Sequence, residues 1–180
     1  MILADIKRIC GLNKWTGIKI FNLLFLPGFW VILVYRYGNF FTNLKILVLK
    51  QIGIITYLPL KFLVEILWSI SISRHAQIGP GLFINHFGCI FIHFDCKIGK
   101  NCVLSQEVTI GVKGADTHGG APLIGDNVRI GPGAKILGPI KIGNNAIIGA
   151  NAVVVHDVLD NQIVGGVPAQ FIRENTTLNP

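Results

Sequence analysis

The sequence predicts a parallel β-helix preceded by a short helical region, and three observations support this prediction. Aliphatic residues recur every six positions from about Ile78 onward. Glycine is abundant, at 21 of 180 residues, and many glycines directly follow the repeating aliphatic residue. The first 77 residues instead carry long apolar runs without this period. A period of six fits neither a helix nor a simple alternating strand, and it indicates short strands joined by turns.

The period is clearest in the second half of the chain. An aliphatic residue occupies each of these successive repeat positions: Ile124, Ile130, Ile136, Ile142, Ile148 and Val154. Four residues after each comes a second small or aliphatic residue: Val128, Ala134, Ile140, Ala146, Ala152 and Val158. Three hexads form one triangular coil, and stacked coils bury aliphatic columns that no single coil could bury alone.

Two interruptions of the period predict irregular segments. A slip of two residues between Ile90 and Ile92 indicates a bulged or lengthened corner in the early coils. Between Ile110 and Ile124 the register breaks in a polar, glycine-rich segment, which predicts an extended loop. Loops that leave a rigid scaffold commonly carry binding or catalytic groups.

The first part of the chain predicts helices. Two apolar runs, 18–37 and 44–71, are punctuated by Pro27 and Pro59, so we expect two or three short helices there. These helices could pack on the β-helix or contact a membrane, and the sequence leaves both open.

The length of 180 residues allows one full domain and a smaller appendage. We divide the chain into an apolar, basic helical region at 1–73, a β-helix domain at 74–174 and a tail at 175–180.

The net charge of +7 comes from the N-terminal part. Residues 1–77 hold nine Lys and Arg against two acidic residues, whereas residues 78–180 hold seven of each. A basic, apolar segment without a dense Lys/Arg stripe favours an anionic membrane surface over nucleic acid. The longest uncharged stretch, 20–35, is shorter than the roughly 20 residues of a spanning helix, so we expect helices lying on the surface. No cleavable signal peptide is evident, which predicts a cytoplasmic protein, peripheral on the inner face of the cell membrane.

The four cysteines show no CxxC pair and no metal-ligand spacing with histidine, so we expect neither a disulfide nor a metal site. Cys96 and Cys102 lie six residues apart on the repeat, which predicts small buried side chains.

Several motifs between Ile78 and Glu174 resemble the hexapeptide-repeat acyltransferases, within their serine acetyltransferase-like branch that includes polysaccharide O-acetyltransferases. The resembling stretches are Ile-Gly-Pro-Gly-Leu-Phe-Ile-Asn-His at 78–86, Val-Thr-Ile-Gly at 108–111, the repeats at 121–138, and Gly-Gly-Val-Pro-Ala-Gln-Phe-Ile at 165–172. The resemblance implies a mainly β fold, a left-handed parallel β-helix, and an O-acetyltransferase that uses acetyl-CoA. It also implies a homotrimer or a dimer of trimers, with the cofactor in the groove between neighbouring β-helices.

The resemblance places the catalytic histidine at His86 and a second active-site histidine at His118, in the predicted loop. An imidazole titrates near neutral pH and can take the proton of an alcohol that attacks a thioester. Substrate contacts are expected at Asn85, Asp116 and Thr117. The other histidines, His75, His93 and His156, are interpreted as structural.

The residues that would line the cofactor groove are small, because the pantetheine arm must lie against the backbone. By resemblance they are Gly131, Pro132, Gly133, Ala134, Gly149 and Ala150. Arg173 matches a basic position near the CoA phosphates, and a guanidinium suits that anion. Each glycine, taken alone, also fits an ordinary coil corner.

Three departures from serine acetyltransferases shape the expected acceptor. Asn85 replaces an aspartate, Thr117 replaces an arginine, and Ser71 stands at the aspartate that orients the catalytic histidine. These losses of charge favour a neutral acceptor over a zwitterion. We therefore expect a sugar hydroxyl of a surface polysaccharide as the acceptor. Two alternatives stay open: serine O-acetyltransferase of cysteine biosynthesis, and a non-catalytic β-helix scaffold.

Overall fold

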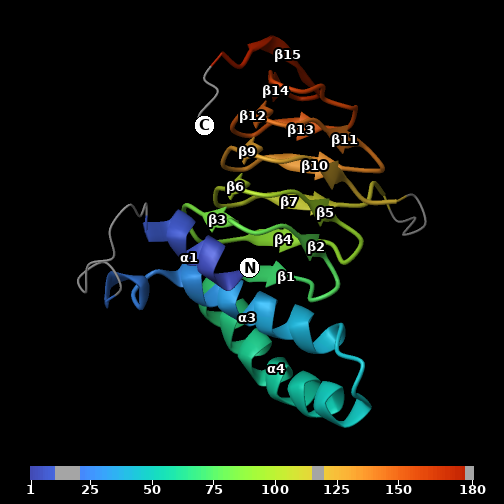
Figure 1. Cartoon of the computed structure of the whole chain (residues 1–180). Helices are drawn as coiled ribbons and strands as arrows, with labels where there is room; N and C mark the ends of the chain where they lie inside the picture. The colour runs from blue at the N-terminus through green and yellow to red at the C-terminus, as the bar shows by residue number, and fades with distance from the viewer. Residues whose placement is uncertain (11–20, 115–119, 177–180) are drawn as a thin grey trace.

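The computed structural model describes residues 1–10, 21–114 and 120–176. A parallel β-helix forms most of the molecule, and helices close its N-terminal end (Figure 1). This arrangement confirms the mainly β fold with a helical lead-in.

Each coil contributes strands to three sheets, which form the three faces of the β-helix. Sheet A consists of β1 (Ile70–Ile72), β4 (Ile90–Ile92), β7 (Thr109–Gly111), β10 (Lys135–Leu137) and β13 (Val153–Val154). Sheet B consists of β2 (Gln77–Ile78), β5 (Lys97–Ile98), β8 (Leu123–Ile124) and β11 (Lys141–Ile142). Sheet C consists of β3 (Phe83–Ile84), β6 (Val103–Leu104), β9 (Arg129–Ile130), β12 (Ile147–Ile148), β14 (Gln162–Gly166) and the antiparallel β15 (Ala169–Glu174). The first residue of the β-helix is thus Ile70, so a boundary at residue 74 falls inside the first coil.

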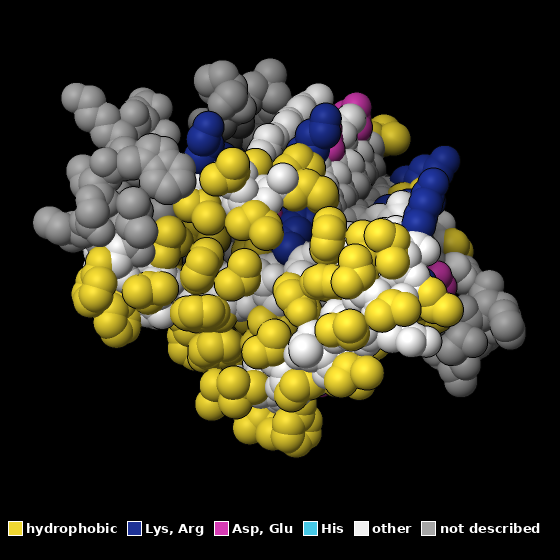
Figure 2. All heavy atoms as spheres, turned by 60° about the horizontal axis from the view of Figure 1, so that its bottom comes forward, with side chains coloured by type: hydrophobic (Ala, Val, Ile, Leu, Met, Phe, Trp, Pro, Cys, Tyr) yellow, Lys and Arg dark blue, Asp and Glu magenta, His cyan; other side chains and the backbone are white. Residues whose placement is uncertain are grey.

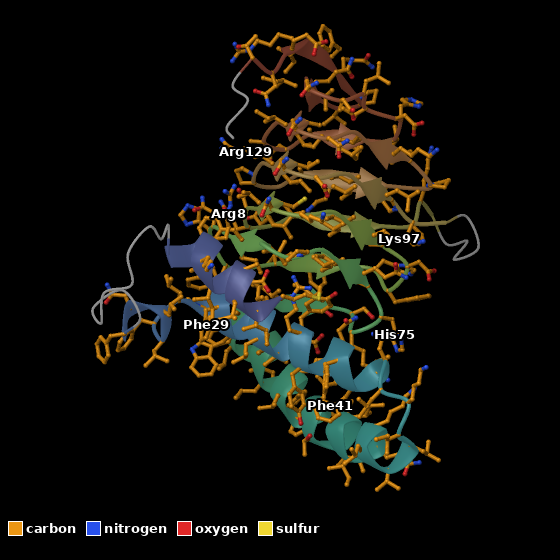
Figure 3. The ribbon with its side chains drawn as sticks, viewed as in Figure 1. Arg8, Phe29, Phe41, His75, Lys97 and Arg129 are labelled. Carbon is orange, nitrogen blue, oxygen red and sulfur yellow. The ribbon has the colours of Figure 1, made fainter. Side chains whose placement is uncertain are left out.

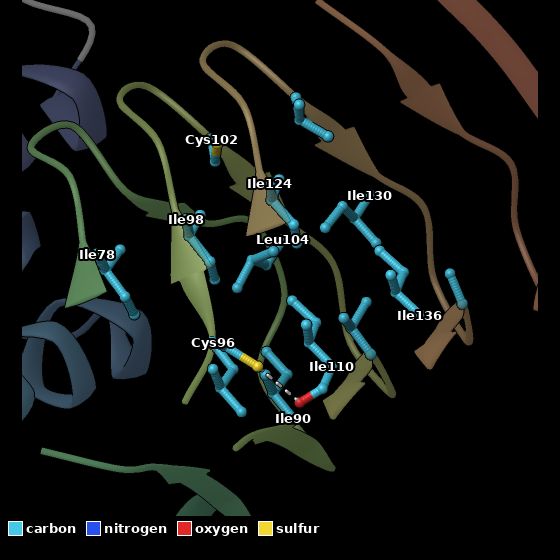
Figure 4. Packing of buried hydrophobic residues seen from close by; sticks show 14 of the residues in the cluster. Ile78, Ile90, Cys96, Ile98, Cys102, Leu104, Ile110, Ile124, Ile130 and Ile136 are labelled. Carbon is cyan, nitrogen blue, oxygen red and sulfur yellow. Dashed lines mark hydrogen bonds between the residues drawn. The ribbon is translucent and has the colours of Figure 1, made fainter. Parts of the chain in front are cut away.

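The interior of the β-helix consists of stacked aliphatic side chains (Figure 4). Every residue of the two predicted columns is buried, and Ile136 is 0% exposed. Their neighbours on the strands point outward, as Lys97 and Arg129 do (Figure 3). Cys96 and Cys102 are buried as expected, and burial raises the pKa of the Cys96 thiol to about 12.

The early coils contain the predicted lengthened corner, but not between Ile90 and Ile92, which belong to strand β4. Ile84 of β3 pairs with Leu104, twenty residues later, whereas Ile130 pairs with Ile148, eighteen residues later. The two additional residues lie at 85–89, between β3 and β4. This corner contains His86.

Asparagines with positive φ make the corners between sheets B and C. Asn101, Asn127, Asn145 and Asn161 have φ between 56° and 60°. Asparagine accepts this left-handed conformation more readily than most residues. The side-chain amide of each donates to the amide oxygen of the next, over 3.3, 3.1 and 3.0 Å. We call these four residues the asparagine ladder, and it ties successive coils together.

Three described helices precede the β-helix: α1 (Ile2–Cys10), α3 (Pro27–Thr42) and α4 (Leu47–Trp68). Pro27 begins α3, as expected for proline at the first helical position. Pro59 instead lies inside α4, which is 22 residues long in total and continues past Pro59 to Trp68. The expectation that the second run forms only short helices is therefore wrong. Packing of α4 against α3 outweighs the cost of Pro59, and Gly38 and Gly53 allow that packing, because a Cβ at either would overlap an aromatic ring of the facing helix.

A buried ion pair joins the helices to the first coil. Asp5 of α1 accepts hydrogen bonds from Arg36 of α3 over 2.9 and 3.1 Å, and both side chains are at most 4% exposed. Arg36 also donates to the carbonyl oxygens of Ile78 and Gly79, both over 2.6 Å. Asp5 also accepts from the backbone N–H groups of Gly81 and Leu82, over 2.7 and 3.0 Å. Sequence reasoning did not identify this contact.

Candidate active site

The lengthened corner at 85–89 presents His86 to solvent. Ile84 and Ile90 are buried on either side of it, whereas Asn85, His86 and Phe87 are exposed. Its backbone is fixed to the next coil: the N–H of Asn85 donates to Leu104 O over 2.9 Å, and Gly88 O accepts from Glu107 N over 2.8 Å. The scaffold therefore holds an exposed imidazole on a well-anchored turn.

Within the described residues, no group hydrogen-bonds to the His86 imidazole. A general base is usually oriented by a second group that bonds its other nitrogen. That second group must come from the loop, from the substrate or from a neighbouring copy of the chain.

The candidate cofactor residues lie along the same edge of the β-helix as His86. We define this histidine edge as the four corners between sheets C and A, at 85–89, 105–108, 131–134 and 149–152. Backbone hydrogen bonds link each corner to the next: Glu107 N to Gly88 O, Gly133 N to Gln106 O, and Asn151 N to Pro132 O, over 2.8, 2.9 and 2.8 Å. Residues far apart in sequence thus share one continuous edge.

The small residues of this edge are explained first by stacking of the coils. A Cβ on Gly131 would lie 2.9 Å from Ala150 N and from Ile148 O. Gly133 has φ +73°, a conformation that other residues rarely adopt. Ala134 is buried in the interior, whereas Pro132 and Ala150 are exposed on the edge. Between the His86 corner and β14, a ligand on this edge would therefore meet backbone, Pro132 and Ala150, together with the exposed side chains of Glu107 and Asn151.

Arg173 lies apart from His86. It is exposed on β15, the last strand, where it pairs with Ile163 of β14. The histidine edge leads toward that end of the molecule, through the corner at 149–152. A long ligand with one end at His86 would have to extend along the histidine edge toward β14 to approach Arg173.

The predicted loop leaves the β-helix from a different corner. It begins after β7 of sheet A and ends before β8 of sheet B. Asp116, Thr117 and His118 lie outside the described residues, so their predicted roles stay predictions. The corner that carries His86 lies at the opposite border of sheet A.

The outer face of sheet A carries a hollow of about 280 Å³ between these two borders, lined in part by Ser71, Phe91, His93 and Thr109. His93 is half-buried, and its Nδ1 accepts from the backbone N–H of Asp95 over 3.3 Å. This contact agrees with a structural role for His93 at its corner. His75 and His156 are both exposed.

Ser71 is connected to a carboxylate that sequence reasoning missed. Its hydroxyl donates to Glu65 Oε1 over 2.5 Å, and Lys61 donates to the same oxygen over 2.6 Å. Burial by itself would raise the pKa of Glu65, but the hydrogen bonds from Lys61 and Ser71 outweigh it and lower that pKa. A carboxylate that is paired with Lys61 therefore lies beside Ser71, although residue 71 is uncharged. Glu65 lies in α4, six residues before Ser71, and no sequence motif connects these two residues.

Comparison with known proteins identifies the class. Residues 121–156 match the family model described as bacterial transferase hexapeptide (six repeats). A truncated serine acetyltransferase apoenzyme superimposes with a TM-score of 0.81 at 30% identity, covering 95% of this chain and 68% of that chain. The chain belongs to the hexapeptide-repeat acyltransferase family.

Within that family, the relatives compared are serine acetyltransferases. The enzyme of Synechococcus elongatus is 32% identical over 159 residues, which are 88% of this chain and 62% of that protein. The Brucella abortus enzyme in complex with coenzyme A superimposes with a TM-score of 0.82 at 28% identity, covering 96% of this chain and 66% of that chain. The chain thus spans about half to two thirds of the length of such curated relatives.

These relatives contradict the expectation of a sugar acceptor in surface polysaccharide biosynthesis and favour the serine alternative. The expectation was wrong because it judged the charge of the site from single motif positions. A folded protein brings groups together from different segments: the carboxylate of Glu65, paired with Lys61, reaches Ser71 from helix α4. The charge of the acceptor therefore does not follow from Asn85, Thr117 and Ser71 alone.

Proposed function

We propose that this chain is an acetyl-CoA-dependent O-acetyltransferase that acetylates the hydroxyl group of serine, with His86 as the general base. The observation that carries this proposal is the similarity to serine acetyltransferases over nearly the whole chain, 95% in one superposition. The exposed His86 at the start of an edge lined by small residues is consistent with it.

The proposed reaction needs one proton transfer in each direction. His86 takes the proton from the serine hydroxyl while its oxygen attacks the thioester carbon of acetyl-CoA. The tetrahedral intermediate then collapses, the carbon–sulfur bond breaks, and the imidazolium returns the proton to the leaving sulfur. Backbone N–H groups or the second histidine could stabilise the oxyanion. The products are O-acetylserine and CoA, so atoms and protons balance.

We further propose that the active unit is a homotrimer with sites between neighbouring copies. His86 lies at one border of sheet A and the loop with His118 leaves from the other. A neighbouring copy would bring its own loop to the exposed His86 edge. This arrangement would also supply the second group that the imidazole needs.

The function is tested by incubating the full chain with acetyl-CoA and L-serine and measuring O-acetylserine by mass spectrometry. We expect His86→Ala to lower turnover by about two to four orders of magnitude, the usual range for a general base. CoA affinity, measured by calorimetry, should change little. His156→Ala is the matched control, since His156 is exposed on the same β-helix but off the histidine edge. Near-normal turnover of His86→Ala would refute the assignment, and no acetyl transfer to any alcohol would support the scaffold alternative.

The acceptor and the shared site need separate tests. Ethanolamine lacks the carboxylate of serine, so equal kcat/KM values for the two would argue against serine as the physiological acceptor. A mixture of His86→Ala and His118→Ala subunits should regain activity after subunit exchange if each site uses both copies. Sedimentation velocity that shows only a monomer would exclude the shared site.

A further inference from the structure

Helix α4 is arranged with its charges toward the protein and its apolar side chains toward the outside. It contains three charged residues, Lys50, Lys61 and Glu65, and all three are partly buried. They lie on the stripe that also holds the buried Gly53, Tyr57 and Val64. A helix on a water-soluble surface shows the opposite pattern. The side of α4 that faces away from the protein is therefore poorly suited to contact with water.

The outer side of α4 is almost entirely apolar. Its exposed positions carry no charge, and only Gln51 and Thr56 are polar. The large apolar residues exposed there are Leu47, Val48, Leu49, Ile52, Ile55, Leu58, Leu60, Phe62, Leu63, Ile66 and Leu67. The helix is long and apolar enough to cross a membrane, yet only 17% of its most apolar window is buried in the protein. It is not a core helix.

This surface continues onto the neighbouring segments, and Figure 2 shows hydrophobic side chains covering this side of the molecule. Phe21, Leu24, Phe25 and Leu26 are exposed before α3, and Phe40 is exposed on α3. A groove of about 870 Å³, with an apolar lining drawn from α1, α3 and α4, opens beside them. We call these exposed residues of α4, α3 and segment 21–26 the apolar face.

The exposed charged side chains in the described part of 1–73 are all positive. They are Lys7 and Arg8 on α1, where Arg8 lies on the side toward the β-helix (Figure 3), and Lys45 directly before α4. The acidic residues in the described part of 1–73 are both paired: Asp5 with Arg36 and Glu65 with Lys61. An apolar surface in a region whose exposed charges are cationic complements the acyl region and the anionic headgroups of a bilayer. A protein partner would leave this face with few of the hydrogen bonds that protein interfaces normally contain.

We propose that the apolar face inserts into the surface of an anionic phospholipid bilayer, so that the protein is peripheral to the membrane. α4 would lie in the interface rather than cross it. A spanning orientation would take Lys50, Lys61 and Glu65 into lipid and detach α4 from α3, which the Asp5–Arg36 pair holds to the first coil. The β-helix extends away from this end of the molecule (Figure 1). The inference does not depend on the proposed function.

The test measures co-sedimentation of the full chain with vesicles of mixed phosphatidylcholine and phosphatidylglycerol, and with vesicles of phosphatidylcholine alone. We expect binding to the mixed vesicles that weakens with salt. The triple variant Ile55→Ser, Phe62→Ser and Ile66→Ser should bind about ten- to a hundredfold more weakly. These residues are 67%, 66% and 62% exposed, so their replacement leaves the core intact.

The matched control is the triple variant Leu159→Ser, Val167→Ser and Phe171→Ser on the β-helix, whose side chains are 68%, 73% and 54% exposed. It should bind vesicles like the wild type. Equal loss in both variants would overturn the proposal, because binding would then reflect general hydrophobicity. Absence of vesicle binding, with a smaller mass of the α4 variant by light scattering, would show instead that a second copy covers the face.

Discussion

The β-helix and the helical region distribute their apolar residues in opposite ways. In β10, Ile136 is fully buried and its neighbours Lys135 and Leu137 lie toward the outside. In α4, Ile55 is 67% exposed, while Lys61 faces the protein and pairs with Glu65. The β-helix therefore contains its own hydrophobic core, whereas the helical region depends on its surroundings to cover most of its apolar surface. This difference teaches that apolar composition does not by itself predict a core.

The largest effect should come from the buried ion pair that joins the two regions. Asp5→Ala leaves the Arg36 guanidinium buried without its counter-charge, which should destabilise the protein by about 3 to 5 kcal/mol. Lys61→Met removes the half-exposed Lys61–Glu65 pair and should cost at most about 1 kcal/mol. Urea unfolding followed by circular dichroism measures both. Equal effects would mean that the helical region does not depend on the Asp5–Arg36 pair for its attachment.

The next effect compares one isoleucine from each region. Ile136→Ala creates a cavity between coils and should lower the free energy of unfolding by about 2 to 5 kcal/mol. Ile55→Ala removes exposed surface, and without lipid the change should stay within about 0.5 kcal/mol. Urea unfolding in detergent-free buffer measures the change in the free energy of unfolding for both variants. A large loss for Ile55→Ala would show that α4 is covered by protein in solution.

A smaller effect is expected at the asparagine ladder. Asn127→Ala places a Cβ residue without a local hydrogen bond at φ 59°, and removes contacts to Asn101 and Asn145. We expect a loss of about 1 to 2 kcal/mol. Asn127→Gly loses the same side-chain contacts but accepts the backbone conformation, so it should be less harmful. If glycine were as harmful as alanine, the loss would come from the side-chain contacts rather than from the left-handed backbone conformation.

The smallest effect is a pH dependence at the junction of α4 and β1. The folded protein lowers the pKa of Glu65, so the carboxylate stabilises the fold above its unfolded pKa, and this contribution is lost as the pH falls through the folded pKa. Glu65→Gln should therefore reduce the difference in thermal midpoint between neutral and acidic pH. An unchanged difference would assign the acid sensitivity to other carboxylates.

The six-residue period predicted the β-helix because each repeat position faces the interior, as Ile124 and Ile130 do. The two-residue shift of the register predicted a lengthened corner, but near Ile90 and Ile92 rather than at His86, because the period does not show where the two additional residues lie. The Asp5–Arg36 pair was not predictable, because Asp5 lies 31 residues before Arg36 and α1 carries no motif. Glu65 was missed although it lies only six residues before Ser71, because no motif connects the two positions. Sequence patterns report repeated environments well, whereas single long-range polar contacts leave no periodic signal.

The hydrogen bonds of Tyr35 and Arg36 to the first coil have a consequence for the strand edges at the end of the β-helix. A parallel β-helix could in principle add further coils at either end, and an open strand edge is a template for aggregation. At one end, the Tyr35 hydroxyl accepts a hydrogen bond from Ile78 N over 3.2 Å and Arg36 donates to Ile78 O, so the edge of β2 is occupied. At the other end, β15 turns back antiparallel on β14 and ends the parallel series. The edges of β2 and β14 are thus not free to pair with further strands, which protects these two edges of a repetitive fold from edge-to-edge association.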